Sequence, residues 1–420
     1  MKAGPRRQCK VRERSRVSPR DVLALSALAA STLVAGVAGA DPLRLRGDAL
    51  VQTRSPAPTG LLVLRGEDGK RFGKTIVDAE TVAWLGAFSG DDASVGDVLT
   101  LSVRARHAPT GSELRAGRMV VTMGAIRPTH VDGARGLVRA FGGTTLEAFA
   151  GAPVARRFDY RTFDFATGGR LGQSVGDAAA VGVSYAQRHN GASLADEEVG
   201  ADVAVAPVPW LSLAGRSAMD LVSRGVTDAL GSLSLTGQRT KAELFATHRS
   251  PGRLLPATSL FSVLGDYAAT SAGTTLRLRA FPRLDLIASG MVQTQAKDVG
   301  GQGSGRVVLA LDDDWNGSIL LEGRRVTLGQ ARWSGVRTAA VIPLSRAYRL
   351  GTEIELVRPD DPRGRGSLWP WAFVSMSRRS ASGLEFGVGV EASSGPDRRE
   401  EVVALGRVSV EWDSLRGATR

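Results

Sequence analysis

The chain alternates apolar and polar residues over short stretches. Between positions 101 and 106, Leu, Val and Ala alternate with Ser and Arg, and between 384 and 391 the alternation lasts for eight residues. The same period of two recurs at 43–46, 181–185, 276–280 and 408–412. A period of two places successive side chains on opposite faces of a strand. Turn-forming residues follow at 109–111, 190–191, 316–317, 360–362 and 394–397. Because no helix-period segment of useful length follows residue 40, we predict an all-β fold of roughly 16 to 21 strands.

The composition of the polar face favours a transmembrane barrel over a soluble β protein. That face is rich in Arg, Glu, Gln, Ser, Thr and Gly, which a wet lumen accepts and a dry core does not. Runs of about ten residues suit a tilted membrane crossing, and no propeller-like repeat of about 40–50 residues is present. A closed barrel also leaves no strand edge exposed. Aromatic residues near run ends suit an interfacial girdle: Trp84, Trp210, Trp315, Trp333, Trp369, Trp371, Trp412 and Tyr348. We therefore predict a single antiparallel transmembrane β-barrel over residues 41–420.

Residues 1–40 have the pattern of a secretory signal peptide. Eight Lys and Arg residues precede an apolar stretch at 22–38, which is followed by small residues. Ala38 and Ala40 occupy the −3 and −1 positions, so cleavage is expected after Ala40. The alternative is a membrane anchor, for which a stretch of about 17 residues is marginally short.

Removing residues 1–40 changes what the net charge and the cysteine count imply about function. The chain of 420 residues has a formal net charge of +12 and one cysteine, Cys9. Residues 41–420 keep 46 Lys and Arg against 40 Asp and Glu, and no cysteine. A mildly basic, exported chain is not an obvious nucleic-acid binder. Disulfides and a Cys-cluster metal site are excluded, the four histidines are scattered, and no metal or other cofactor is expected.

These features resemble those of bacterial outer-membrane β-barrels of Gram-negative envelopes, and most closely porin-like channels of 16 to 18 strands. The segment from Arg115 to Phe149 looks like the strand, inward loop and return strand of such channels. The resemblance implies a pore constriction formed by Arg115, Arg118, Arg127, Asp132, Arg135, Arg139 and Glu147. It also implies contact with outer-membrane lipid and lipopolysaccharide and recognition by the barrel-assembly machinery, and it leaves homo-oligomerisation open. The chain departs from the family pattern where eight residues follow Trp412, since such barrels often end on an aromatic residue.

We expect a passive channel for small hydrophilic solutes, with an anion preference if the arginines stand free in the lumen. The arginines could instead neutralise lumenal carboxylates or contact lipopolysaccharide. Other readings remain: a structural, assembly or adhesive barrel with a plugged lumen, a secreted soluble β protein, or a barrel enzyme. The enzyme reading rests on a G-x-S-x-G match centred on Ser174, where we expect a strand and turn rather than a catalytic elbow. His189 and His248 show no spacing that marks them as its partners. We do not expect the protein to be an enzyme. Gly300–Arg306 is expected to be a hairpin loop, and Asp312–Asp314 to cap a strand beside a turn.

Overall fold

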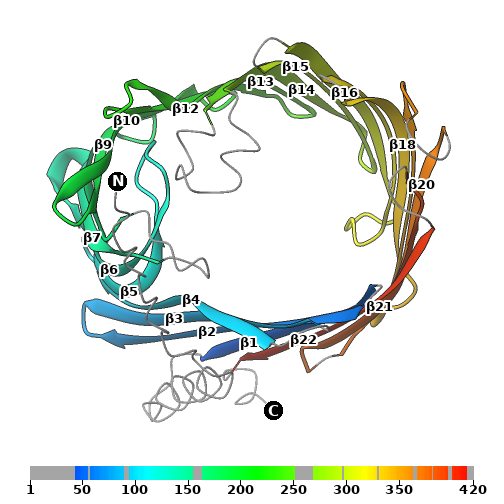
Figure 1. The fold of residues 1–420 in the computed structure, drawn as a ribbon, viewed down its shortest axis with the longest axis horizontal. Coiled ribbons are helices and arrows are strands. Elements are labelled where there is room, and N and C mark those ends of the chain that lie inside the picture. Colours follow the sequence, from blue (N-terminus) through cyan, green and yellow to red (C-terminus); the bar gives the residue numbers. More distant parts are fainter. Residues whose placement is uncertain are drawn as a thin grey trace, which may run out of the picture.

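The protein is a single closed β-barrel of 22 antiparallel strands (Figure 1). The computed structural model describes residues 43–54, 57–88, 94–154, 163–250, 268–295, 298–328, 331–362, 367–380, 382–395 and 400–413. The signal peptide expected at 1–40, with Ala38 and Ala40, and the irregular segment at 251–256 lie outside the described residues. No helix among the described residues is long and apolar enough to cross a membrane.

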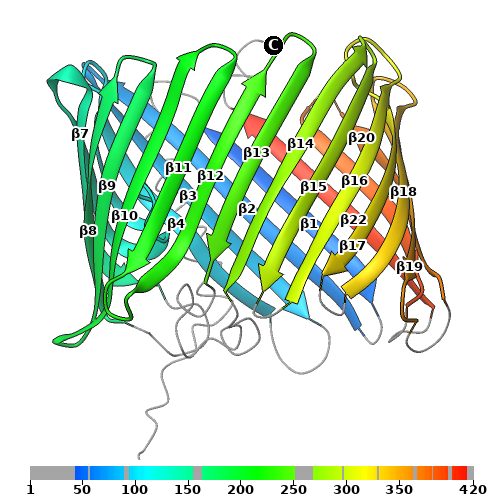
Figure 2. The same cartoon turned by 90° about the horizontal axis from the view of Figure 1, so that it is seen from above.

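The strands are joined in chain order. Their bounds, with the single 3-10 turn, are β1 Arg44–Arg54, β2 Ala57–Phe72, β3 Thr75–Phe88, β4 Ser94–His107, β5 Ser112–Val121, β6 Thr129–Arg139, η1 Phe141–Gly143, β7 Thr144–Pro153, β8 Phe165–Val175, β9 Ala179–Asn190, β10 Ser193–Val208, β11 Leu211–Asp220, β12 Gly225–Thr236, β13 Thr240–Arg249, β14 Ala269–Phe281, β15 Leu284–Gln295, β16 Asp298–Ala310, β17 Ser318–Leu328, β18 Ala331–Pro343, β19 Tyr348–Pro359, β20 Trp369–Arg379, β21 Leu384–Ser393 and β22 Glu401–Asp413. Each strand pairs with its sequence neighbours, and β1 pairs with β22 from Arg44↔Asp413 to Thr53↔Ala404, which closes the ring. Figure 2 shows the strands inclined to the barrel axis.

The 22 strands exceed both the 16 to 21 predicted from the pattern and the 16–18 that the resemblance implied. One reason is the Gly-rich run at 300–306, which we expected to be a loop but which lies inside β16. Gly weakens the alternation signal because it adds no side chain to either face. A second reason is the polar start of β10, where 196–198 are all acidic and a register shift between Leu194 and Asp196 interrupts the alternation.

The two ends of the barrel differ. We call the end with connections after even-numbered strands the turn end; β1 begins and β22 ends there, and its longest connection is 311–317. The other end, with connections after odd-numbered strands, is the loop end, and its longest connections are 154–164, 250–268 and 360–368. Because the number of strands is even, the start of β1 and the end of β22 lie at the same end of the barrel.

The outward face of the strands is an apolar band. Val388 is 66% exposed and Leu114 60% exposed, and large apolar residues on nearly every strand are similarly open. A soluble monomer rarely exposes contiguous apolar patches larger than a few hundred Å². This band therefore faces lipid, as in a membrane-spanning barrel.

Aromatic residues are divided between the two faces. At the turn end the exposed aromatics include Phe72, Trp210, Phe281 and Trp412. By contrast, Trp333 packs beside the inward Arg324, and Trp371 stacks at 6.2 Å on Phe373 and donates to Glu391. Only some of the expected girdle residues therefore face the membrane boundary.

Candidate functional site

The lumen wall is lined by rows of alternating charge that run across neighbouring strands. The inward face of β3 to β7 has the order Asp78, Arg104, Glu113, Arg135 and Glu147, one residue from each strand. Arg104 lies 2.8 Å from Asp78 and 3.9 Å from Glu113, and Arg135 lies 3.6 Å from Glu113 and 2.5 Å from Glu147. We call this row the first charge ladder. Each of its arginines contacts a carboxylate on either side.

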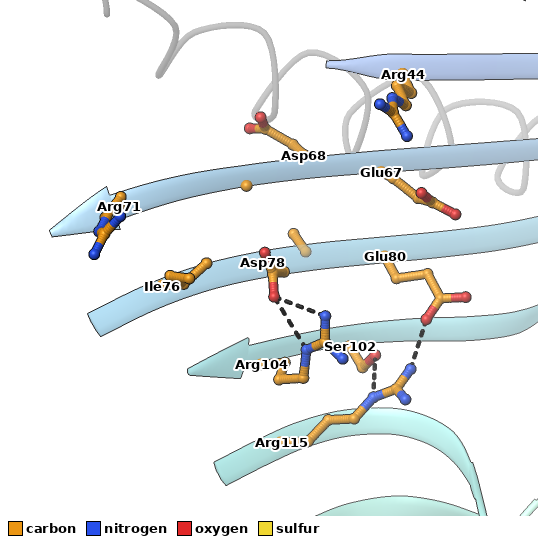
Figure 3. Close-up of a pocket in the computed structure, with 12 residues that line it drawn as sticks. Arg44, Glu67, Asp68, Arg71, Ile76, Asp78, Glu80, Ser102, Arg104 and Arg115 are labelled. Carbon is orange, nitrogen blue, oxygen red and sulfur yellow. Dashed lines mark hydrogen bonds and ion pairs between the residues drawn. The ribbon is translucent and has the colours of Figure 1, made fainter. Parts of the chain in front are cut away.

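A further set of polar contacts lies beside the first charge ladder. Arg115 on β5 donates to Glu80 at 2.7 Å and to the Ser102 hydroxyl at 2.9 Å (Figure 3). These residues border a polar hollow of about 540 Å³ on the wall formed by β1 to β5. Figure 3 also shows the pair between Arg104 and Asp78 in the same hollow.

A second charge ladder lies on the opposite side of the ring, across β16 to β19. Its order is Arg306, Glu322, Arg337 and Glu353, with 3.0 Å, 3.8 Å and 2.5 Å between successive charged groups. Arg324 and Glu355 form a further pair next to it. Charged side chains of both signs at neighbouring strand positions are tolerated on this face because it is wet.

The connection between β5 and β6 folds into the barrel and lies on the inner face of β7 to β10. Met123 and Ile126 of this connection pack in one cluster with Phe149, Ala166 and Ala186. Figure 1 shows the cyan chain inside the ring near β9 and β10. We call residues 122–128 the inner loop. An inward loop was expected to span 127–139, before a return strand at 146–149. The structure instead places it at 122–128, because residues 129–139 form β6, which is the return strand.

Buried charges fix the inner loop to the wall. Arg127 pairs with Asp196 and lies 3.2 Å from Glu198, a residue that is 0% exposed. Arg188 of β9 contacts the same two carboxylates at 2.8 Å and 3.4 Å. Gly200 of β10 leaves the space for this packing, since a Cβ there would lie 3.0 Å from the Cβ of Ala125. The inner loop is therefore held by two guanidinium groups and two carboxylates that are largely removed from water.

The seven residues expected at a constriction lie in different environments. Arg115, Arg135 and Glu147 lie together on the lumen wall, and Arg127 lies in the inner loop. The alternation of β5 and β6 places Arg118 and Asp132 on the outward face near the loop end, where they pair at 2.8 Å.

Arg139 lies at the turn end of β6. It is exposed, and none of the described residues forms an ion pair with its guanidinium. Because Arg139 lies at the turn end and the inner loop lies at the loop end, the two are separated along the barrel axis.

The other motifs resolve into strands and turns. Ser174 lies within β8, which continues to Val175 and turns into β9, so a strand follows it rather than a helix. His189 lies at the opposite end of β9, paired with Phe165, while Ser174 pairs with Ala180. The Asp312 carboxylate accepts from the backbone N–H groups of Asn316 and Gly317, which confirms its turn-capping role. The described residues contain no group of three or more His, Cys, Asp or Glu residues placed to hold a metal.

Comparisons with known proteins agree on the fold. No family model and no curated protein matches this chain. Two solved structures of the translocation pore of the P pilus usher PapC are similar to it at a TM-score of 0.50. One is 8% identical over 88% of this chain and 99% of that chain. The other is 9% identical over 89% and 99%. The fold is that of an outer-membrane β-barrel. Pseudomonas aeruginosa OccD3 (OpdP) is also similar, at 9% identity over 89% of this chain and 91% of that chain, with a TM-score of 0.43.

Proposed function

We propose that the protein is a porin-like passive channel of the outer membrane for small hydrophilic solutes. The observation that carries the proposal is the closed barrel with charge ladders on two sides of its inner wall. A wall of paired charges stays hydrated and offers hydrogen-bond partners to a polar solute without holding it tightly. The described residues contribute strands, short connections and the inner loop, and none of them forms a separate plug domain.

An anion preference is part of the proposal, and we expect it to be modest. Residues 41–420 have more bases than acids, and fixed positive charge lowers the energy of an anion in a pore. The ladder arginines are each matched by carboxylates, which offsets most of their field at the lumen. Of the seven candidate residues, Arg115, Arg127, Arg135 and Glu147 form the proposed constriction set, with Arg135 and Glu147 the best placed of them. Arg118 and Asp132 on the outward face and Arg139 at the turn end are not part of it.

The loop end is proposed to face the cell exterior. Longer extracellular loops and shorter periplasmic turns are typical of such barrels. The exposed aromatics at the turn end suit the periplasmic boundary of the membrane. Export by a signal peptide at 1–40 and insertion by the barrel-assembly machinery complete this proposal.

A barrel enzyme is the less supported alternative. Ser174 and His189 lie at opposite ends of adjacent strands, which separates the only motif-based nucleophile from its nearest histidine in the sequence. A structural or adhesive barrel with a plugged lumen is an alternative with the same fold. A measurement of transport is therefore needed to distinguish it from a channel.

Single-channel recording in planar bilayers tests the proposal. We expect discrete conductance steps and, in a salt gradient, a reversal potential of anionic sign. Protein that is folded by its heat-modifiable gel migration but does not conduct would support the plugged barrel. Full solubility without detergent would contradict a membrane barrel altogether.

A further inference from the structure

Three groups of charged residues lie on the outward face near the loop end. One group is Arg118 with Asp132, and another includes Glu197 beside the Tyr185 hydroxyl. In these groups, acids equal or outnumber bases. A third group, on β17 to β19, has the opposite balance.

On the outward face of the described residues, the third group contains three arginines and one acid. Arg325, Ser334 and Arg358 occupy one row across β17, β18 and β19. In the next row toward the loop end, the N–H of Asp360 donates to the carbonyl of Arg332 at 2.9 Å. We call Arg325, Arg332, Arg358 and Asp360 the outward arginine cluster. Strand alternation directs these side chains away from the lumen, because their neighbours Arg324 and Trp333 face inward.

The cluster has an excess of positive charge. Both terminal nitrogens of Arg325 contact the Asp360 carboxylate at 2.5 Å, and one also donates to Ser334 at 3.0 Å. The hydrogen bonds from Arg325, together with the charges of Arg332 and Arg358, hold the pKa of Asp360 below its usual value. Within the described part of the chain, Arg332 and Arg358 have no hydrogen-bond or ion-pair partner for their guanidinium groups. Two cations are therefore left at the edge of the lipid-facing band.

An apolar strip continues from the cluster toward the membrane centre. On the same strands, Val336 is 52% exposed, Ile354 51% and Leu356 41%. A ligand that fits both parts has an anionic head and hydrocarbon chains. Planar guanidinium groups bind phosphate through paired N–H donors, and more strongly than they bind water.

We propose that the outward arginine cluster binds the phosphate group of an anionic lipid in the leaflet at the loop end, with its acyl chains on the apolar strip. If the loop end is exterior, as in the proposed function, that lipid is lipopolysaccharide. Phosphate at headgroup depth supplies further counter-charge to Arg332 and Arg358, which share the carboxylate of Asp360 with Arg325.

Native mass spectrometry of the full chain in detergent micelles tests this site without depending on orientation. The probe is bis-phosphorylated lipid A, added at increasing concentration to wild type and to R332Q/R358Q. We expect the double variant to weaken lipid A binding about tenfold or more, because charge-assisted hydrogen bonds to phosphate are lost. The matched control is R378Q, which removes an exposed arginine at the turn end and should bind as wild type does.

Two further arms identify the chemistry. Dephosphorylated lipid A should bind wild type and R332Q/R358Q equally, and millimolar inorganic phosphate should not displace lipid A if the acyl chains contribute. Equal binding of lipid A by wild type and R332Q/R358Q would overturn the proposal. Displacement by inorganic phosphate would also overturn it, in favour of a soluble-anion site. Channel conductance is measured on the same preparations, and we expect R332Q/R358Q to conduct as wild type does, so failure of the lipid site is separable from failure of the channel.

Discussion

At the scale of single residues, one of the tightest backbone approaches lies between β6 and β7. A Cβ at Gly133 would lie 2.2 Å from the carbonyl oxygen of Ala150 and 2.6 Å from the Cα of Gly151. Backbone atoms cannot move aside as a flexible side chain can. Only glycine therefore fits this position without separating the two strands.

The variant G133A is expected to destabilise the barrel by about 1–3 kcal/mol, the usual cost of overpacking. The measurement is the temperature at which the folded band disappears in heat-modifiable electrophoresis. G136A on the same strand is the matched control, since a Cβ there meets nothing within 4 Å. Equal loss of stability in both variants would contradict the close-approach explanation.

The buried carboxylate of Glu198 holds the inner loop. The variant E198A removes this carboxylate and leaves Asp196 as the carboxylate that Arg127 and Arg188 share, in a site of low exposure. Removing one partner of a buried ion pair costs about 3–5 kcal/mol. We expect the inner loop to detach from the wall while the barrel remains closed.

A cysteine at Ala125 reports this detachment. Ala125 is buried against Gly200, so C9S/A125C should react slowly with maleimide. In C9S/A125C/E198A we expect labelling to become fast, whereas the same cysteine with D132N, an outward substitution, should stay protected. Fast labelling without E198A would show that the inner loop is not fixed by these charges.

At the scale of elements, the period-two pattern was sufficient to predict the faces of many strands. The stretches 101–106, 276–279 and 384–391 have their apolar residues outward and their polar residues toward the lumen, as expected. It was not sufficient where Gly or acidic runs dilute the alternation, as in β16 and at the start of β10, so the strand number was underestimated. The all-β fold and the single barrel were predicted correctly.

The candidate site was only partly predictable, for a reason visible in two arginines. Arg115 and Arg118 are three positions apart on one strand, and an odd separation puts them on opposite faces. The sequence therefore contained the signal that they could not share a lumenal constriction. The partners of each charge depend on strand register, which the sequence alone does not fix. For the same reason Glu198 and Arg188, which hold the inner loop, were missed.

The first charge ladder predicts a defined effect on ion selectivity. R135Q leaves Glu113 and Glu147 without their shared cation, so the lumen gains negative charge. A unit charge about 8 Å from a passing ion changes its energy by about 0.5 kcal/mol in water, so the anion-to-cation permeability ratio should fall roughly two- to fivefold. Reversal potentials in a salt gradient measure this ratio.

The control for this experiment is R118Q. Arg118 lies on the outward face, paired with Asp132, and its loss should leave the reversal potential unchanged. An equal shift in R118Q and R135Q would mean that the assigned faces of β5 and β6 are incorrect.

At the scale of the whole molecule, the difference between the two ends predicts an orientation. Ala192 lies in the short β9–β10 connection at the loop end, and Ala178 lies in the β8–β9 connection at the turn end; both are exposed. With C9S, a membrane-impermeant maleimide applied to intact cells should label A192C and leave A178C unlabelled. After the cells are lysed, both should react. Labelling of A178C alone on intact cells would reverse the proposed orientation.

The pairing of β1 with β22 also determines when the barrel can form. Every other strand pair joins sequence neighbours, whereas Ser409 contacts Asp48 across 361 positions of the chain. Hairpins form quickly because their loops are short, while ring closure must bring together the two most distant strands. Until then the sheet has two unpaired edges, each able to accept a strand from another molecule. The lifetime of that open sheet, rather than the stability of the finished ring, sets how much protein is lost to aggregation.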